Sequence, residues 1–341
     1  MFVPVVDKNQ KPLMPTTPSR AKRWIKSGKA TPFWNHGVFC VRLNVEPSDR
    51  KTQDVVIGVD PGSKKEGFTV KSSAHTFINI QADAVTWVKD VVKIRRLMRN
   101  NRRRRKTPCR QPRPNRAQHK QFVAPSTKAR WQWKLRLLVW MRRMYPVTCV
   151  VVEDIKAITK KGKRRWNKTF SQLEYGKAWF YQQIKVMGIR LEKRFGFDTK
   201  ALRDALGLKK SHSKLSSRFD AHCVDSWVLA NEQTGGHIAP DNTEMLLISP
   251  LRLHRRQLHM LEPATGGIRQ RYGGTRSLGF KRGSLVKNKK YGVAYVGGYR
   301  DVKGCPGTRL TLHDPHSGER VCRATRPESC QFLTFNSWIT S

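Results

Sequence analysis

Three acidic residues that lie far apart in the sequence each adjoin an apolar segment. Asp60 ends the apolar run 55–60, Glu153 ends the valine-rich run 149–153, and Asp220 begins a segment with helical apolar spacing. An ionised carboxylate in such a setting is costly unless a cation binds it. Three acids brought together by folding can hold divalent cations against a phosphodiester. The pattern therefore predicts metal-assisted phosphodiester hydrolysis, with these three residues as catalytic groups and metal ligands.

Each of these assignments has a competing interpretation. Asp60 stands in an Asp-Pro-Gly sequence, which is a good β-turn by itself. Asp154 competes with Glu153, although alternation along a strand would point the two side chains to opposite faces. Asp225 follows Asp220 by five residues, about 140° around a helix, so these two side chains should face different ways.

Three further residues are accessory candidates for the metal shell. His222 lies two residues after Asp220, on another face of the predicted helix. A lone histidine in such a segment is more often structural than catalytic. The sequence leaves open which of the accessory candidates complete the site. They are His212, His222 and Asp225.

The charge of the chain points to a polyanionic partner. Lys and Arg number 68 against 24 Asp and Glu, a formal net charge of +44. Residues 91–152 contain 19 Lys or Arg and no acid, whereas a solvated charged helix normally mixes signs. We therefore predict that this segment binds nucleic acid. The predicted contacts are Arg95, Arg96, Arg99, Arg102, Arg103, Arg104, Arg105, Lys106, Arg110, Arg113 and Arg116.

The spacing of the cysteines and the lengths of the apolar runs argue against a zinc module and against a membrane-spanning helix. None of the seven cysteines forms a Cys-x-x-Cys pair, so a zinc ribbon or a zinc-supported HNH module is not indicated. No apolar run approaches the roughly 18 residues of a membrane-spanning helix, and the first residues do not resemble a signal peptide. We expect a reducing cytoplasm.

Apolar periodicity predicts an α/β fold around the three acids. Residues 53–80 read as two or three strands around Asp60, and the β-branched run 147–152 as a central buried strand. After about residue 233, short strands at 291–296, 309–312 and 331–335 predict a β-rich domain. The predicted helices cover 20–27, 128–144, 170–187, 220–230 and a segment that begins at Trp87.

The order of these elements matches the RNase H-like plan, in which acids from the first strand, a later strand and a last helix converge on two metals. Several segments also resemble the transposon-encoded IscB proteins, relatives of type II CRISPR effectors. The resemblance covers their PLMP domain, their three RuvC motifs and their arginine-rich bridge helix. The segments that carry it are Lys11–Pro15 with Ala21–Ala30, Ile57–Ser63, Val151–Asp154, Asp220–Cys223 and Arg95–Arg116.

One departure from IscB points to a subgroup. Only 66 residues separate Glu153 from Asp220, and they contain no cysteine and one histidine, so an HNH nuclease has no place there. The chain thus resembles IsrB, the HNH-lacking relative. The third RuvC motif of this family usually has a histidine three residues before the aspartate. Ser217 stands at that position before Asp220, and His212 lies eight residues before it.

The resemblance implies an RNA-guided DNA nickase. A large guide (omega) RNA would pair with one strand of double-stranded DNA beside a short adjacent motif, and the RuvC-like site would cut the displaced strand. Its cofactor would be Mg²⁺ in a two-metal site, for which Mn²⁺ can substitute. The partners would be the guide RNA and the target DNA. One protein chain would bind both in a ribonucleoprotein, and no membrane would be involved. The complex would work in a prokaryotic cytoplasm and associate with the nucleoid when DNA is bound.

The resemblance also implies a domain order. A RuvC/RNase H-like core is joined by an N-terminal PLMP-like unit, an arginine-rich bridge helix and a β-rich C-terminal domain that contacts the motif beside the target. The predicted ranges are 1–52 for the PLMP-like unit, 53–86 for the first RuvC-like segment, 87–118 for the bridge helix and basic extension, 119–232 for the other two RuvC-like segments, and 233–341 for the C-terminal domain.

Two other classes of protein share part of this pattern. An unguided RNase H-like nuclease, such as a junction resolvase or a transposase, would use the same acids without a guide RNA. A non-catalytic nucleic-acid-binding protein would use the basic segments alone. The PLMP-like unit and the long arginine helix argue against the first class, and the three acids argue against the second.

Overall fold

The computed structural model describes residues 2–104, 123–156, 172–211, 213, 216–251, 276–300 and 307–340. The chain forms two compact units, Met1–Leu247 and Ile248–Ser341. The division into domains predicted from the sequence is finer than this and stays a prediction. No helix in the described ranges is both long and apolar enough to cross a membrane.

The first unit begins with a small sheet that one helix covers. Helix α1 (Pro18–Lys26) begins where the side chain of Thr17 accepts a hydrogen bond from the backbone of Arg20. Gly28 follows the helix with a φ of 71°, the left-handed conformation in which a glycine commonly ends a helix. The helix predicted at 20–27 is confirmed within two residues. The strands lie in the order β2-β1-β4-β3 and cover β1 (Val3–Val6), β2 (Pro12–Thr16), β3 (Ala30–Asn35) and β4 (Val38–Leu43).

A larger sheet forms the centre of the first unit. Its order is β7-β6-β5-β8-β9. The strands β5, β6 and β7 pair antiparallel, whereas β8 runs parallel to β5 and β9 parallel to β8. This is the RNase H-like arrangement predicted from the order of elements. The strands are β5 (Val55–Asp60), β6 (Lys65–Lys71), β7 (Thr76–Asp83), β8 (Val147–Glu153) and β9 (Arg190–Arg194).

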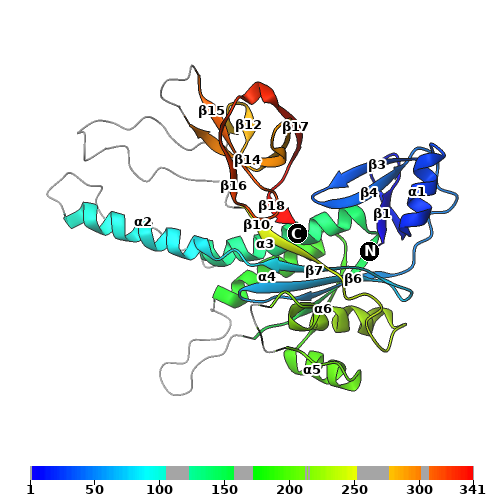
Figure 1. Ribbon diagram of the computed structural model, residues 1–341. Coiled ribbons are helices and arrows are strands. Elements are labelled where there is room, and N and C mark those ends of the chain that lie inside the picture. The colour runs from blue at the N-terminus through cyan, green and yellow to red at the C-terminus, as the bar shows by residue number, and fades with distance from the viewer. Residues whose placement is uncertain are drawn as a thin grey trace. The chain divides into compact units, whose positions relative to one another are not determined.

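Helix α6 (Phe219–Thr234) packs closely on this sheet because two glycines face it. A Cβ atom at Gly58 of β5 would clash with the backbone oxygen of Ser226, and one at Gly67 of β6 with that of His222. The close approach fixes which side of α6 meets the sheet. Figure 1 shows α6 beneath the sheet, with α5 (Gly196–Ala205) beyond it.

Helix α3 (Pro125–Met144) contacts β6 and packs against α4 (Gln172–Val186). Lys134 of α3 donates a 2.7 Å hydrogen bond to Glu66 of β6, and both side chains are buried. Each charge would be costly without the other. The helices predicted at 128–144, 170–187 and 220–230 are thus confirmed within a few residues, and β9 and α5 are additional elements.

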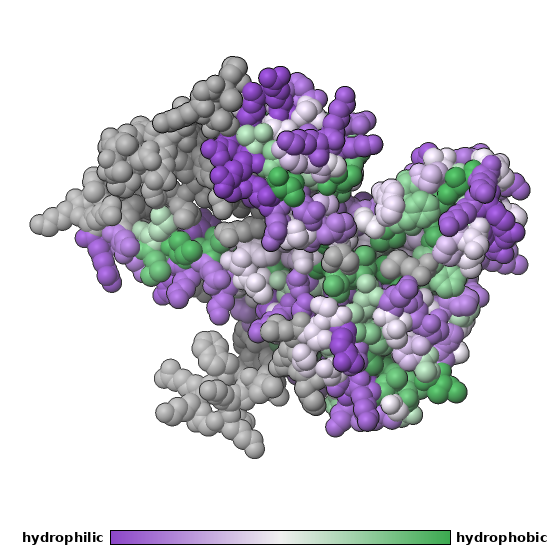
Figure 2. All heavy atoms as spheres, in the orientation of Figure 1, coloured by the Kyte–Doolittle hydropathy of each residue, from purple (hydrophilic) through white to green (hydrophobic). Residues whose placement is uncertain are grey.

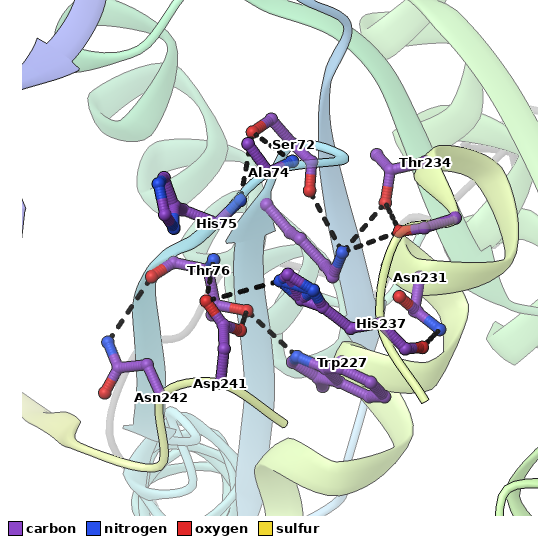
Figure 3. A network of polar contacts seen from close by, with 12 residues as sticks. Ser72, Ala74, His75, Thr76, Trp227, Asn231, Thr234, His237, Asp241 and Asn242 are labelled. Atoms are coloured by element: carbon purple, nitrogen blue, oxygen red, sulfur yellow. Dashed lines mark hydrogen bonds and ion pairs between the residues drawn. The ribbon is translucent and has the colours of Figure 1, made fainter. Parts of the chain in front are cut away.

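A polar network holds the end of α6 beside the turn that joins β6 to β7 (Figure 3). The ammonium group of Lys71 donates to the hydroxyl of Thr234 and to the backbone oxygen of Gly235, at 3.3 and 2.9 Å. On the same helix, the indole of Trp227 donates to the hydroxyl of Thr76 at 2.9 Å. Asp241 accepts a 2.8 Å hydrogen bond from the Thr76 backbone. These contacts fix α6 along its length on β6 and β7.

The buried ammonium of Lys71 should make stability depend on pH. Burial lowers the pKa of Lys71 from 10.5 to about 8, so between these values the unfolded chain binds more protons than the folded one. The free energy of unfolding should therefore rise with pH across this window. In denaturant unfolding, we expect the free energy of unfolding of the wild type to rise by about 1–2 kcal/mol more than that of Lys71→Met between pH 7.5 and 9.5. A constant difference between the two proteins would contradict this.

The second unit is built on a five-stranded antiparallel sheet in the order β16-β15-β14-β13-β17. Its core consists mainly of Val286, Val296, Leu310 and Leu312. The short strands predicted after residue 233 are confirmed. They fall in β14 (Gly292–Arg300), β15 (Arg309–His313) and β17 (Cys330–Phe335), with β13 (Ser284–Asn288) and β16 (Arg320–Thr325) beside them.

Candidate metal and nucleic-acid site

Three carboxylates meet where the two central parallel strands end. Asp60 is the last residue of β5 and Glu153 the last of β8, and the register pairs Val59 with Val152 just before them. Asp225 reaches the same place from α6. One oxygen from each carboxylate lies within 4.8 Å of the other two. The sheet therefore positions two of the acids, and the close packing of α6 positions the third.

The cluster concentrates negative charge. Burial, together with the nearby negative charges of Asp60 and Asp225, raises the pKa of Glu153 to about 8. Oxygen ligands that repel one another in this way are the donor set that hard divalent cations prefer. The residues present therefore fit a divalent metal site.

Two basic side chains contact these acids, and neither was predicted from the sequence. The ammonium of Lys210 lies 3.1 Å from Oδ2 of Asp60 and also pairs with Oδ2 of Asp225. The guanidinium of Arg203 donates a 2.6 Å hydrogen bond to the other oxygen of Asp225. Burial alone lowers the pKa of Lys210, but the charges of Asp60 and Asp225 outweigh this and raise it. The cluster therefore binds Lys210 in its charged form.

Asp220, which we predicted as the third ligand, does not join this cluster. Its carboxylate pairs with Arg218 at 3.2 Å and is 34% exposed, whereas the side chain of Asp225 is 4% exposed. The spacing of five positions turns the two side chains to different sides of α6, as we expected from the sequence. Asp225, named there only as an accessory candidate, holds the third position.

Of the two candidate histidines, the structure describes the position of one, His222. His222 lies three residues before Asp225, and residues three apart share one side of a helix. Both His222 and Asp60 line a cavity of about 940 Å³. The three-residue spacing of histidine and aspartate that the resemblance led us to expect at Asp220 is present instead at His222 and Asp225. This signal could have pointed to Asp225. His212 lies outside the described residues.

Asp154 belongs to a different set of contacts. Its carboxylate accepts hydrogen bonds from the ammonium of Lys177 at 2.7 Å and the hydroxyl of Tyr181 at 2.8 Å. Both partners lie on α4. As strand alternation predicts, Asp154 points away from the cluster that Glu153 joins.

The cavity beside the carboxylates is lined by cations. Its wall includes Asp60, Asp204 and His222 together with basic side chains from the β5–β6 connection, β6, α5 and the segment after α5. Such a wall suits a phosphate chain that approaches a metal site. The basic residues are Lys64, Lys65, Lys200, Arg203, Lys209 and Lys210.

A second basic surface runs along α2 (Trp87–Arg104), which projects away from the sheet (Figure 1). Hydrophobic side chains lie among hydrophilic ones along it (Figure 2), and Ile94 and Leu97 are about half exposed. The helix predicted from Trp87 is confirmed. Exposed side chains on it are Lys93, Arg95, Arg96, Arg99, Arg103 and Arg104. The side chain of Arg102, and Arg105, Lys106, Arg110, Arg113 and Arg116, lie outside the described residues.

Comparison with known proteins finds one matching family and several similar solved structures. The family described as RRXRR protein matches residues 3–196, which is more than half of the chain. No curated protein matches. A structure of T. thermophilus RuvC in complex with a Holliday junction substrate is 12% identical, with 54% of this chain and 98% of that chain covered and a TM-score of 0.29. A second Thermus thermophilus RuvC structure is 14% identical, with 53% and 97% covered and a TM-score of 0.26.

Proposed function

This chain belongs to the RRXRR protein family, and we propose that it is a metal-dependent, RNA-guided DNA nickase of the IsrB kind. The observation that carries the proposal is the meeting of Asp60, Glu153 and Asp225 at the end of an RNase H-like sheet. Basic surfaces beside this cluster and along α2 supply the contacts that a nucleic acid needs.

The three carboxylates are the proposed metal ligands. Mg²⁺ bound there would lower the pKa of a water for attack on the phosphodiester and would stabilise the leaving oxygen. Asp60 and Glu153 are held by adjacent strands, so their separation changes little. His222 lies on the same side of α6 as Asp225, where its imidazole can accept a proton or bind the phosphate. The cations of the cavity would orient the strand to be cut.

Cutting of a single strand is consistent with the number of sites. In the part of the chain that the structure describes, one group of acidic side chains has the spacing of a metal site. The interval between Glu153 and Asp220 has no room for an HNH nuclease. One active site on an opened duplex would leave a nick rather than a double-strand break.

Guidance by RNA rests on the arginine-rich helix and on the resemblance to IsrB. Arg95, Arg99 and Arg103 recur at intervals of four and therefore line one side of α2. A straight row of guanidinium groups suits the regular phosphate backbone of an RNA or an RNA–DNA hybrid, which a guided nuclease recognises by shape. Sequence would then be read by base pairing rather than by the protein.

The proposal can be tested on the purified complex. The chain would be co-expressed with its native flanking DNA and purified through high salt, and the RNA that remains bound would be sequenced. We expect one discrete, long RNA with a variable guide end, and Mg²⁺-dependent nicking of a DNA that matches it. Heterogeneous cellular RNA, or none, together with cleavage of branched DNA, would instead support an unguided RNase H-like nuclease.

A further inference from the structure

A lysine lies where a metal ion would bind. The ammonium group of Lys210 is 3.1 Å from Oδ2 of Asp60 and pairs with Oδ2 of Asp225. These are two of the three carboxylates whose oxygens have the spacing of a metal site. The lysine therefore pairs with two of the carboxylates that the metal would need.

The backbone brings Lys210 to this position. Helix α5 ends at Ala205, and Gly207, with a φ of 66°, turns the chain back toward α6. The backbone N–H of Ser211 then donates a 2.9 Å hydrogen bond to the carbonyl of Asp220. Since this bond ties the segment to the first turn of α6, the lysine stem starts close to the carboxylates.

The two cations at Asp225 differ in how easily they can leave. Arg203 holds Oδ1 of Asp225 from α5, and its side chain is 13% exposed. Lys210 holds Oδ2, and its side chain is 33% exposed. A lysine ammonium is a point charge on a flexible four-carbon stem, whereas a guanidinium is rigid and planar. Arg203 can therefore stay in place while Lys210 moves.

Charge requires that Lys210 move when a divalent cation binds. An ammonium and a divalent ion that share carboxylate oxygens would repel each other at a distance of a few ångströms. The cavity of about 940 Å³ beside the cluster gives the lysine a place to go, because Lys210 itself lines it. A phosphate of a bound nucleic acid would be a favourable partner for it there.

We propose that Lys210 is a displaceable counter-ion of the metal site. It pairs with Asp60 and Asp225 while the site holds no divalent ion, and it leaves these oxygens when an ion binds. This inference rests on the proposed metal site. Because only the fraction of molecules with Lys210 displaced can bind the ion, the lysine weakens the apparent affinity for metal by that fraction.

The test is the binding of Mn²⁺ to the full chain, freed of nucleic acid in high salt, by titration calorimetry at constant pH. Lys210→Met should bind Mn²⁺ on the order of tenfold more tightly than the wild type. Lys209→Met is the matched control, because Lys209 lines the same cavity and carries the same charge but is exposed. It should bind Mn²⁺ as the wild type does.

Thermal unfolding supplies an independent measurement. In a chelator, Lys210→Met should melt below the wild type, because Asp60 and Asp225 lose a counter-ion. Added Mn²⁺ should raise its melting temperature by more than it raises that of the wild type. Lys210→Gln, which keeps a polar group, serves the same comparison if the methionine variant does not fold.

The outcomes separate this inference from the proposed function. Equal affinities in the wild type, Lys210→Met and Lys209→Met would overturn the role of Lys210 and leave the metal site standing. Tighter binding in both variants would also overturn it, because general charge would then account for the gain. A wild type and a Lys210→Met variant that both fail to bind Mn²⁺ would overturn the metal site as well.

Discussion

Asp225→Asn is expected to lower the single-turnover rate of DNA nicking by roughly a thousandfold, because the change removes a charged metal ligand at nearly constant shape. The carboxylate of Asp225 lies with those of Asp60 and Glu153 in the one cluster suited to a metal within the described ranges. Binding to guide RNA and target DNA should be retained, because affinity comes from Lys and Arg contacts elsewhere. A nicking assay under single-turnover conditions measures the effect.

Asp220→Asn is the matched control for this prediction. It makes the same chemical change on the same helix, but Asp220 pairs with Arg218 and lies outside the cluster. Its nicking rate should stay within about threefold of the wild type, since an exposed ion pair contributes little. The reverse result, with Asp220→Asn inactive and Asp225→Asn active, would restore the assignment made from the sequence and reject the geometry described here.

The second large effect is expected at α2. Replacing Arg95, Arg99 and Arg103 together by Gln should weaken binding of the guide RNA on the order of a hundredfold at moderate salt. The dependence of log affinity on log salt should become shallower by roughly 2–3 units, because about three fewer counterions are released. A filter-binding titration at several salt concentrations gives both numbers.

Replacing the same three arginines by Lys distinguishes charge from guanidinium geometry. If α2 recognises backbone charge, this variant should keep the salt dependence of the wild type and lose only a small part of its affinity. An unchanged affinity in the Gln variant would show that the row of arginines does not bind the RNA, and the proposal of guidance through this helix would then be wrong.

The fold was largely predictable because strong local patterns mark its central elements. The valine-rich run before Glu153 and the apolar run that ends at Asp60 both favour buried strands, and both lie at the centre of the sheet. The strand β9 (Arg190–Arg194) was missed because its sequence, Arg-Leu-Glu-Lys-Arg, is mostly charged. This segment forms a strand because it pairs in parallel with β8. Such pairing is a tertiary interaction, which the local sequence pattern does not reveal.

The site was only partly predictable. Asp60 and Glu153 could be identified because each ends an apolar strand, where a carboxylate needs a reason to be present. The choice between Asp220 and Asp225 depends on which side of α6 faces the sheet, and Gly58 and Gly67 determine that side through contacts distant in sequence. The spacing of three residues between histidine and aspartate favours Asp225, because His222 stands three residues before it. The sequence reasoning measured this spacing from Asp220 and therefore did not use it.

Lys210 could not have been found from the sequence. It is one of 68 Lys and Arg residues, and its residue type alone does not distinguish it from the others. Its role arises from a turn at Gly207 and from a backbone hydrogen bond between Ser211 and Asp220. Contacts between segments, rather than residue type, single it out among the basic residues.

The central claim, that metal ions held by Asp60, Glu153 and Asp225 act directly on a DNA phosphodiester, is tested most directly by sulfur substitution. One non-bridging oxygen of the scissile phosphate would be replaced by sulfur, one stereoisomer at a time, and the single-turnover nicking rate measured in Mg²⁺ and in Mn²⁺. Because Mn²⁺ accepts sulfur ligands more readily than Mg²⁺, we predict a large loss of rate in Mg²⁺ that Mn²⁺ restores for one isomer. Equal rates for the oxygen and sulfur substrates in both metals would contradict metal contact with the phosphate.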